Sequence, residues 1–464
     1  MQGKPLVLLL SVLYGSAFIA GFNENLVNMA LVSIMAEYGV DSVTAQWLVT
    51  GYMIVATVVV TCMAFLYRRF HVRTLFFGAA GLSIVGSAMG LVAPSFELLL
   101  VARLVQAVGT GLFFPSVTSV IMTNSPAAVR GTRLALNSGV IAVGLAISPT
   151  ASGFALTQFG WRAMFVVSLA MSVALLAVGF FRIHGGPSTK RVPIDALSVM
   201  LGPLGLAAFL YGLGEVTRDL APSLAALAVG AVLLALFAWR QFALESPLLD
   251  LHPLVHPRFA VGILLVMVGM LTSFSMSILL PLYYEGALGY TAFFAGLLLL
   301  GPVLVNAAFT FLGGRVFDRH GAWPLIPAGL VLVLVGQATA FFSAESMIAI
   351  LIVLSSAAVY AGAGFVVAPS KTAALGTLPP ATYSAGASIN STAVQIASAI
   401  GSSLFVGVLS ADVLRDTAAG AAKASAYAAA FEHTLSIAVV IAAAGLLVAF
   451  FYARAMRKPA GKQR

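Results

Sequence analysis

Apolar runs long enough to cross a lipid bilayer recur along the whole of this 464-residue chain. A membrane-spanning helix needs about 20 apolar residues. The runs have helical composition and lack the alternation of polar and apolar residues that marks a membrane β-barrel. A bilayer offers no water to unpaired backbone groups, so such runs favour a helical bundle. We therefore predict an all-α membrane protein with fourteen transmembrane helices, at residues 6–35, 45–66, 74–93, 97–122, 134–157, 161–182, 194–213, 221–240, 259–284, 292–312, 323–342, 347–369, 386–409 and 433–453.

The composition excludes an ordinary soluble domain, because 61% of the residues are hydrophobic and only 8% are charged. The first run follows a lysine, as a signal peptide would, but it is too long and contains Glu24. We therefore interpret it as the first span. The single cysteine, Cys62, lies inside an apolar run and excludes a disulfide within the chain.

The positive charges lie on one side of the predicted membrane. Of the 24 Lys and Arg residues, nineteen fall in segments on the side of the N-terminus and four in segments on the other side, while Arg103 lies within a span. By the positive-inside rule this bias predicts that both termini lie in the cytoplasm. The basic C-terminal tail is then expected to lie beside anionic lipid rather than to bind nucleic acid.

An acidic residue interrupts the first span, in the sequence GFNENLVNMAL. On a helix, Gly21, Glu24, Asn25 and Asn28 share one face, since they follow the i, i+3, i+4, i+7 rule. From Lys4 to Glu24 is roughly 30 Å of helix, which predicts a carboxylate in the outer half of the membrane. An ionisable group there is costly and is expected to face a bundle interior or a wet cavity and to serve function. The alternative is an acid near a helix end that merely reaches water.

A second polar face is predicted in the fourth span, where Arg103, Gln106, Ala107 and Thr110 have the same helical spacing. Since Glu24 is the only acid in the interior of a predicted span, away from its ends, it is the expected partner of Arg103. The alternative is that Arg103 binds backbone carbonyls or extends outward to water.

Small residues and a proline are spaced along the fifth span, at Gly139, Gly144, Pro149 and Gly153. Small residues permit close contact between helices and proline favours a bend. Helix packing alone would also explain this pattern.

The thirteenth span places Ser391, Gln395, Ser398 and Ser402 on one face with Asn390 beside it. These uncharged groups could line a substrate cavity with Asn23, or could form hydrogen bonds between helices. We include Asn390 and Gln395 among the predicted cavity residues. The full predicted cavity set is Asn23, Asn25, Asn28, Gln106, Thr110, Asn390 and Gln395.

Two loops on the predicted cytoplasmic side resemble each other and indicate an internal duplication. The first, at residues 64–73, and the second, at 313–323, form a predicted cytoplasmic gate whose residues are Arg68, Arg69, Arg73, Gly314, Arg315, Asp318 and Arg319. Polar linkers at 184–191 and 243–258 flank spans seven and eight, which suggests an inserted helical hairpin. We predict a six-helix bundle at 1–182, a linker and two-helix insert at 183–258, and a second six-helix bundle with a basic tail at 259–464.

These motifs resemble those of the major facilitator superfamily. The resemblance rests on Arg103, Gln106 and Gly109, on the glycine and proline series ending at Pro149 and Gly153 and followed by Trp161 and Arg162, and on Gly314, Arg315, Asp318, Arg319 and Gly321. Fourteen spans are similar to those of the fourteen-helix drug:proton antiporters, and the fifth-span motif is associated with exporters. The resemblance implies two six-helix bundles that rock around a central cavity.

The chain also departs from the usual pattern of these antiporters. Asn23 stands where an aspartate is usual and Asn25 where a threonine is usual, so the Asn23-Glu24 pair resembles the branch of lincomycin-type multidrug exporters. In the first loop, Arg68 replaces an acid and His71 a glycine. Asp318 is therefore the better candidate for a latch.

We interpret the chain as a proton-driven exporter of amphipathic compounds in the cytoplasmic membrane, with Glu24 and Arg103 as the coupling residues. The expected partners are a small-molecule substrate, protons and membrane lipid, without nucleic acid, and the protein is expected to act as a monomer. It needs no cofactor beyond a proton gradient. An alternative is the same mechanism for one metabolite, siderophore or bile-acid-like substrate.

Two other classes of function have little support in the sequence. An enzyme within the membrane would need paired acids, a histidine cluster or an activated nucleophile. The six histidines lie in loops or at span edges without the spacing of a metal site, at His71, His184, His252, His256, His320 and His433. A receptor would need an additional domain to report its state.

Overall fold

The computed structural model describes residues 4–124, 127–183, 195–216, 219–244, 247–379 and 382–455, and all regular elements among them are helical. The elements are α1 Lys4–Glu24, η1 Asn28–Ala30, α2 Leu31–Tyr38, α3 Ser42–Arg69, α4 Val72–Val92, α5 Phe96–Asn124, α6 Ala127–Phe159, α7 Ala163–Arg182, α8 Ala196–Glu215, α9 Leu220–Ala243, η2 His252–Val255, α10 Pro257–Gly286, α11 Ala292–His320, α12 Ala322–Ser343, η3 Ala344–Ser346, α13 Ala349–Leu375, α14 Tyr383–Ala418 and α15 Lys423–Ala455. Thirteen stretches of the described residues are long and apolar enough to cross a membrane. The all-helical membrane architecture predicted from the sequence is thus confirmed.

The count of fourteen spans stays a prediction. Its additional member corresponds to α3, in which the described apolar stretch, Thr44–Val60, is shorter than the other thirteen. The predicted domain boundaries at 182/183 and 258/259 also stay predictions.

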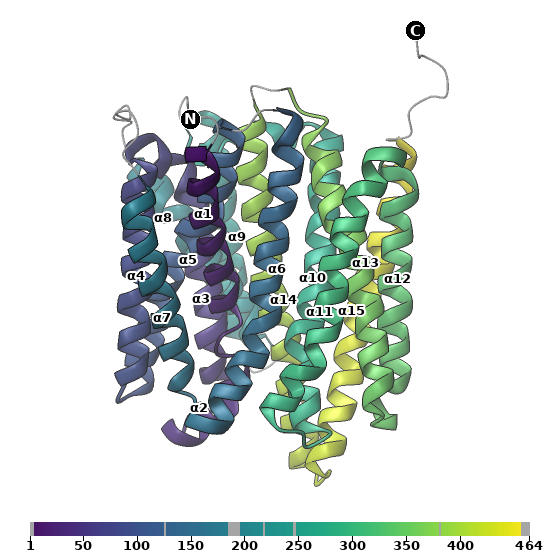
Figure 1. The fold of residues 1–464 in the computed structure, drawn as a ribbon. Helices are drawn as coiled ribbons and strands as arrows, with labels where there is room; N and C mark the ends of the chain where they lie inside the picture. Colours follow the sequence, from purple (N-terminus) through teal and green to yellow (C-terminus); the bar gives the residue numbers. More distant parts are fainter. Residues whose placement is uncertain are drawn as a thin grey trace.

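The helices form two groups that lie side by side. In Figure 1, α4, α5 and α7 lie on one side, α12, α13 and α15 on the other, and α6 and α14 between them. Each group has its own apolar core, one containing Leu13, Phe76 and Phe113, the other Tyr283 and Phe431. α1 begins and α15 ends at the same face of the bundle, the upper one in Figure 1.

The first apolar run does not form the single helix that we expected. α1 ends at Glu24, the chain turns through residues 25–30, and α2 resumes at Leu31. Asparagine side chains compete with helical hydrogen bonds, and here the Asn28 side chain donates to Asn25 Oδ1 at 3.2 Å. The prediction that Gly21, Glu24, Asn25 and Asn28 share one continuous helical face is therefore wrong.

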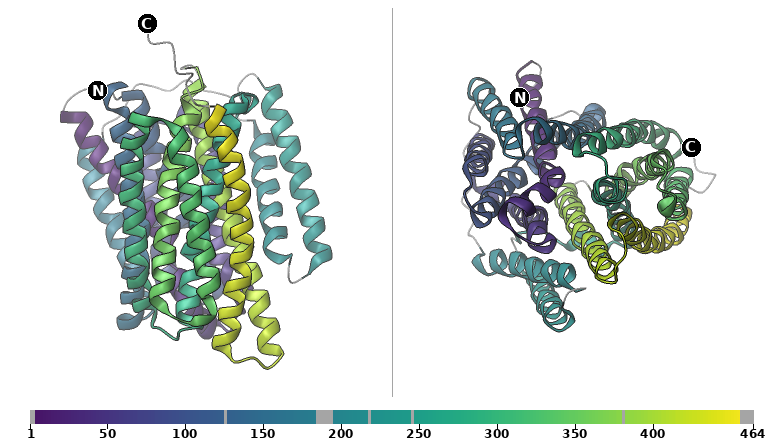
Figure 2. Two further views of the ribbon diagram at one scale, coloured as in Figure 1. Left: turned by 90° about the vertical axis from the view of Figure 1, so that its right-hand side faces the viewer. Right: turned by 90° about the horizontal axis from the view of Figure 1, so that it is seen from below.

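α8 and α9 form a hairpin at the side of the bundle (Figure 2). Their ends are joined by Arg240, which donates two 2.8 Å hydrogen bonds to the Asp195 carboxylate. Ser198 also donates to Asp195, and Gln241 bonds both the Ser198 hydroxyl (2.7 Å) and the backbone N–H of Leu249 (3.0 Å). This network connects α8, α9 and the segment that follows them.

The Asp195–Arg240 pair makes the stability of this hairpin depend on pH. The hydrogen bonds from Arg240 lower the pKa of Asp195 to about 2, below its ordinary value. A lowered pKa stabilises the fold above the unfolded-state value of about 4, and the effect is lost as pH falls through the folded value. Because both groups are partly exposed and the pair is screened by solvent, the R240Q variant is expected to lose only a small part of the stability of the fold.

Thermal unfolding of purified wild type and R240Q in detergent, measured between pH 7 and pH 2.5, checks this prediction. The difference in melting temperature is expected to be constant from pH 7 to about pH 5 and to shrink below about pH 4. If the difference in melting temperature between wild type and R240Q grows as the pH falls, the stabilisation does not come from ionised Asp195 paired with Arg240.

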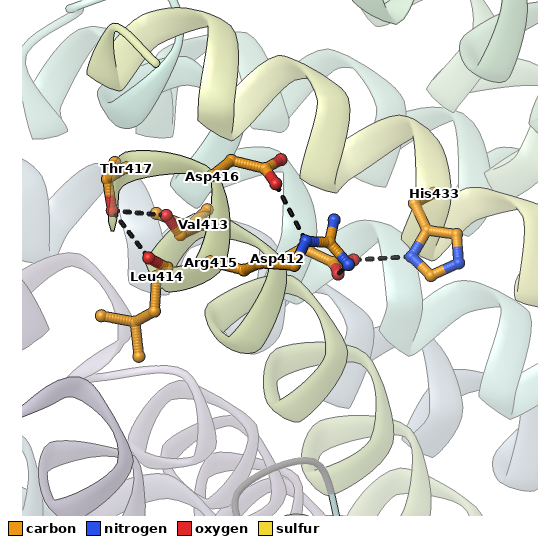
Figure 3. A network of polar contacts seen from close by, with 7 residues as sticks. All are labelled: Asp412, Val413, Leu414, Arg415, Asp416, Thr417 and His433. Atoms are coloured by element: carbon orange, nitrogen blue, oxygen red, sulfur yellow. Dashed lines mark hydrogen bonds and ion pairs between the residues drawn. The ribbon is translucent and has the colours of Figure 1, made fainter. Parts of the chain in front are cut away.

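α14 and α15 continue beyond the predicted spans, which ended at residue 409 and began at residue 433. With 36 residues, α14 is about 54 Å long, more than the roughly 30 Å hydrocarbon core. One of the polar contacts at this end joins the two helices, between buried Asp412 of α14 and His433 of α15 at 2.6 Å (Figure 3). Within α14, Arg415 bonds Asp412 at 3.0 Å and also bonds Asp416. The part of α14 that hydropathy left out of the span thus carries its own polar contacts.

Candidate functional site

A closed ring of polar contacts lies where α1 ends. Arg103 Nη1 donates to the backbone carbonyl of Asn23 and to Gln106 Oε1, both at 3.0 Å. Gln106 Nε2 donates to the Ser87 hydroxyl at 2.8 Å, and the Ser87 and Ser168 hydroxyl oxygens are 3.0 Å apart. Ser168 closes the ring by donating to Asn23 Oδ1 at 2.6 Å. Helices α1, α4, α5 and α7 are thus connected by one hydrogen-bond network inside the membrane.

The break after Glu24 explains why Arg103 binds this end of α1. The last carbonyls of a helix lack backbone partners and carry partial negative charge. The Asn23 carbonyl is in this position, with only a 3.4 Å contact from the Leu26 N–H. The Arg103 guanidinium supplies a strong donor and a positive charge at the same point.

Arg103 is completely buried and is held mainly by neutral groups. Its guanidinium lies 4.0 Å from the centre of the Tyr52 ring, and its Nε donates to the Leu48 carbonyl at 3.4 Å. Tyr52 is fixed in turn by a 2.5 Å contact with the Thr110 hydroxyl. Arg103 Nη2 has no hydrogen-bond partner. The site therefore contains a buried cation with unused donor capacity.

The expected salt bridge between Glu24 and Arg103 is not formed. The structure describes both residues, and every hydrogen bond of Arg103 goes to a neutral group. The alternative that Arg103 binds backbone carbonyls is what the structure contains. The helix break exposes the Asn23 carbonyl, which accepts a bond from Arg103 Nη1, while Nη2 keeps a free donor on the same guanidinium.

Glu24 nevertheless lies within the electrostatic reach of Arg103. It is 4% exposed, and the described residues give its carboxylate neither a hydrogen bond nor a salt bridge. A buried acid without a hydrogen-bond partner is costly when ionised. The pair thus consists of two nearby buried groups of opposite charge, each of which can change its partners.

The turn that follows Glu24 reaches into the C-terminal group of helices. Met29, in η1, is 1% exposed and belongs to the apolar cluster that contains Met276, Tyr283 and Tyr284. A shift of this cluster relative to α1 would therefore move the turn that directly follows Glu24.

The small-residue face of α6 packs against α1 just before the break. A Cβ at Gly144 would collide with the Phe18 carbonyl oxygen and lie 3.1 Å from the Phe22 backbone nitrogen. Ser148, one turn later, donates to the Phe22 carbonyl at 2.6 Å. This part of the predicted exporter motif thus positions the end of α1.

The other motif residues have different surroundings. Pro149 lies inside α6, and its neighbour Thr150 donates to the Gly296 carbonyl of α11 at 3.0 Å. The Gly153 carbonyl accepts a 3.0 Å bond from the Thr157 hydroxyl. A Cβ at Gly139 would meet nothing within 4 Å. The motif therefore contacts both α1 and the C-terminal helices, but not through every residue.

The predicted cavity residues of α14 do not join the ring. Asn390 and Gln395 are buried, and Asn390 Oδ1 has no hydrogen-bond partner. Further along the same helix, Ser402 accepts a 3.1 Å bond from Gln46 of α3. This hydrogen bond to the N-terminal group of helices lies about two helical turns after Gln395.

The predicted cytoplasmic gate is described only in part. Arg73 and Arg315 are exposed and lie 5.6 Å and 4.2 Å from the ring centres of Phe77 and Phe311. Arg69 is also exposed, and Gly314 lies in α11. The side chains of Arg68, Asp318 and Arg319 lie outside the described residues. A latch that involves Asp318 stays a prediction.

Three residues of the site escaped the sequence analysis. Tyr52, Ser87 and Ser168 are uncharged residues in apolar helices. Ser87 and Ser168 each have a second serine four residues away, at Ser83 and Ser172, but small polar residues at this spacing are equally typical of helix packing.

The spans in the structure are longer than predicted, so Glu24 is not the only acid within one. The span in α10 extends to Gly286, two residues beyond the predicted end, and includes Glu285, and the span in α14 extends to Ala418 and includes Asp412.

Comparison with known proteins gives consistent results along the chain. The Major Facilitator Superfamily model matches residues 13–402 and 262–463. The chain is 33% identical to the lincomycin resistance protein LmrB of Bacillus subtilis, over 98% of this chain and 97% of that protein. It is 25% identical to a multidrug resistance protein B homolog of Mycobacterium tuberculosis, over 84% of this chain and 73% of that protein.

Solved structures show the same fold. A POT family transporter in complex with 5-aminolevulinic acid has a TM-score of 0.69 at 14% identity, over 98% of this chain and 97% of that one. A bacterial homolog of the human lysosomal transporter Spinster, inward-facing and unoccupied, has a TM-score of 0.65 at 15% identity, over 99% of this chain and 100% of that one.

Proposed function

Because the chain belongs to the Major Facilitator Superfamily, a family of transporters rather than enzymes, we propose that it exports amphipathic small molecules in exchange for protons. Relatives named for resistance to lincomycin and to multiple drugs support efflux. We further propose fourteen spans, with α8–α9 as an insert between two six-helix bundles, at 1–182 and 259–464. In this proposal the protein lies in the cytoplasmic membrane with both termini in the cytoplasm. It acts as a monomer, and the proton gradient supplies the energy for export.

The observation that carries this proposal is the buried acid at the break in the first span, beside a buried arginine without a salt bridge. Broken helices mark substrate and ion sites in secondary transporters. Ionised Glu24 balances the charge of Arg103, whereas protonated Glu24 leaves that charge to the neutral groups of the ring. Proton binding therefore changes the free energy of the site by an amount that depends on how close Arg103 lies.

The turn at residues 25–30 connects this chemistry to movement of the two groups of helices. Met29 is packed in the C-terminal cluster while Asn23 is held by the ring. In alternating access, one group rocks against the other around a fixed site. Protonation at Glu24 and movement of the C-terminal group thus act on opposite ends of one short segment.

Two contacts between the groups form the proposed outer gate. Gln46 bonds Ser402, and Thr150 bonds the Gly296 carbonyl. Gln46 and Gly296 lie near the starts of α3 and α11, which are at the end of the bundle opposite the face where α1 begins. That end is extracellular in the proposed topology. Release of substrate to the outside requires these contacts to open.

Purified protein in liposomes that contain a pH-sensitive dye tests the function. Addition of lincomycin or an amphipathic cationic dye is expected to change the internal pH only in liposomes with protein, and a protonophore is expected to abolish the change. An imposed pH gradient should drive substrate accumulation. Substrate movement that ignores the gradient would contradict exchange with protons, and a response confined to one chemical class would indicate a dedicated substrate.

A further inference from the structure

An apolar cavity of about 280 Å³ lies between the α8–α9 hairpin and the helices α3, α10 and α14. Leu206 and Phe237 of the hairpin face it from one side, and Ile263 and Ile389 of the bundle from the other. Leu248 and Leu254 close it from the linker that follows α9. The hairpin, which lies at the side of the bundle in Figure 2, therefore encloses a space rather than packing flat.

The chemistry of the cavity wall excludes water as a stable occupant. An internal water needs two or more polar partners, and a large apolar cavity stays dry or binds an apolar molecule. The exceptions to the apolar lining are Cys62 and Thr392. Thr392 Oγ1 is buried and has no hydrogen-bond partner. By contrast, Ser398 on the same helix bonds the carbonyl one turn back at 3.0 Å. The cavity thus suits an apolar chain with a hydrogen-bonding oxygen.

Positive charge lies along the chain next to the cavity. Arg258, at the start of α10, is exposed and forms no salt bridge among the described residues, and His256 beside it is exposed as well. Both follow closely on Leu254, which lines the cavity. In the bilayer, a cation a few residues along the chain from Leu254 and Ile263 of the cavity wall matches a lipid with an anionic headgroup, since each basic residue near the surface attracts such lipids.

We propose that this cavity binds an acyl chain of an anionic phospholipid, with its phosphate against Arg258. The lipid fills the space between the hairpin and the bundle and stabilises α8–α9 where it meets both groups of helices. The site is separate from the ring at Arg103, so the proposal does not depend on proton-coupled export.

Photo-crosslinking of the full-length protein checks the proposal. Phosphatidylglycerol and phosphatidylcholine carrying a diazirine on one acyl chain are the probes, and the crosslinked peptides are identified by mass spectrometry. We expect phosphatidylglycerol to label the helices around the cavity in wild type. The A393F variant, which fills the cavity from α14, is expected to lose labelling at least about tenfold. The R258Q variant is expected to lose about fivefold of the preference for phosphatidylglycerol.

The control is V232F on α9, because Val232 is 58% exposed and does not line the cavity. Its labelling should equal that of wild type. Equal labelling in A393F and V232F would overturn the proposal, and so would equal labelling by the two lipids in wild type. Displacement of the probe by lincomycin would show that the cavity takes the transported compound instead, which also overturns it.

A second measurement covers the case in which A393F does not fold. Cys62 is the only cysteine of the chain and lines the cavity. In wild type, added phosphatidylglycerol is expected to slow its reaction with an apolar maleimide, and phosphatidylcholine is expected to do so less. An unchanged reaction rate would overturn the proposal.

Discussion

The E24Q variant is expected to lose all substrate accumulation driven by a pH gradient while it still folds and still exchanges substrate. Glutamine keeps the shape and polarity of the side chain but cannot take up or release a proton. Because Glu24 is buried and bonded to no other described residue, its replacement removes no contact that holds the fold. The substitution also removes the free-energy cost of a buried carboxylate, which is high when the group is ionised without a partner. The melting temperature is therefore expected to be equal to or higher than that of wild type.

Two assays in liposomes separate coupling from binding. Accumulation against a gradient should fall to the level of liposomes without protein, whereas counterflow of labelled for unlabelled substrate should continue. The matched control is E97Q, since Glu97 is an exposed acid at the start of α5. Gradient-driven accumulation by E24Q at the wild-type rate would remove Glu24 from the mechanism.

The fold class follows from the sequence because the length of an apolar run and its hydrophobicity can be read directly from its residues, without knowledge of their contacts. The break after Glu24 does not, because local hydrogen bonds such as the one from Asn28 to Asn25 decide it. A periodicity rule assumes a continuous helix and so places all polar residues on one face. The same limit explains α14, where Asp412 and Arg415 extend the helix through contacts that hydropathy does not measure.

The candidate site was predictable where its members lie on one helix. Arg103 and Gln106 are three residues apart, and they do bond each other. Ser87 and Ser168 come from other helices and join the ring only through tertiary packing. The missing salt bridge has the same origin, since the backbone carbonyl that replaces Glu24 as a partner of Arg103 becomes available only through the break.

The matched variants G144A and G139A are expected to differ strongly, although both add one methyl group to α6. In a helix interior, Gly to Ala is favourable by up to about 1 kcal/mol when space allows. Gly139 has that space, so G139A should melt at or above the wild-type temperature and transport normally. At Gly144 the methyl group meets the backbone of α1 at Phe18 and Phe22, and backbone cannot move aside as a flexible side chain would.

We expect G144A to be destabilised by about 1 to 3 kcal/mol and to lose at least about tenfold in gradient-driven accumulation. The larger effect on transport has a structural reason: displacement of α1 from α6 strains the bond from Ser148 to Phe22 and moves the helix end that carries Glu24. Melting temperature and liposome accumulation, measured on both variants together, check this. If G144A and G139A transport equally well, close packing at Gly144 does not position the acid, and the motif only packs helices.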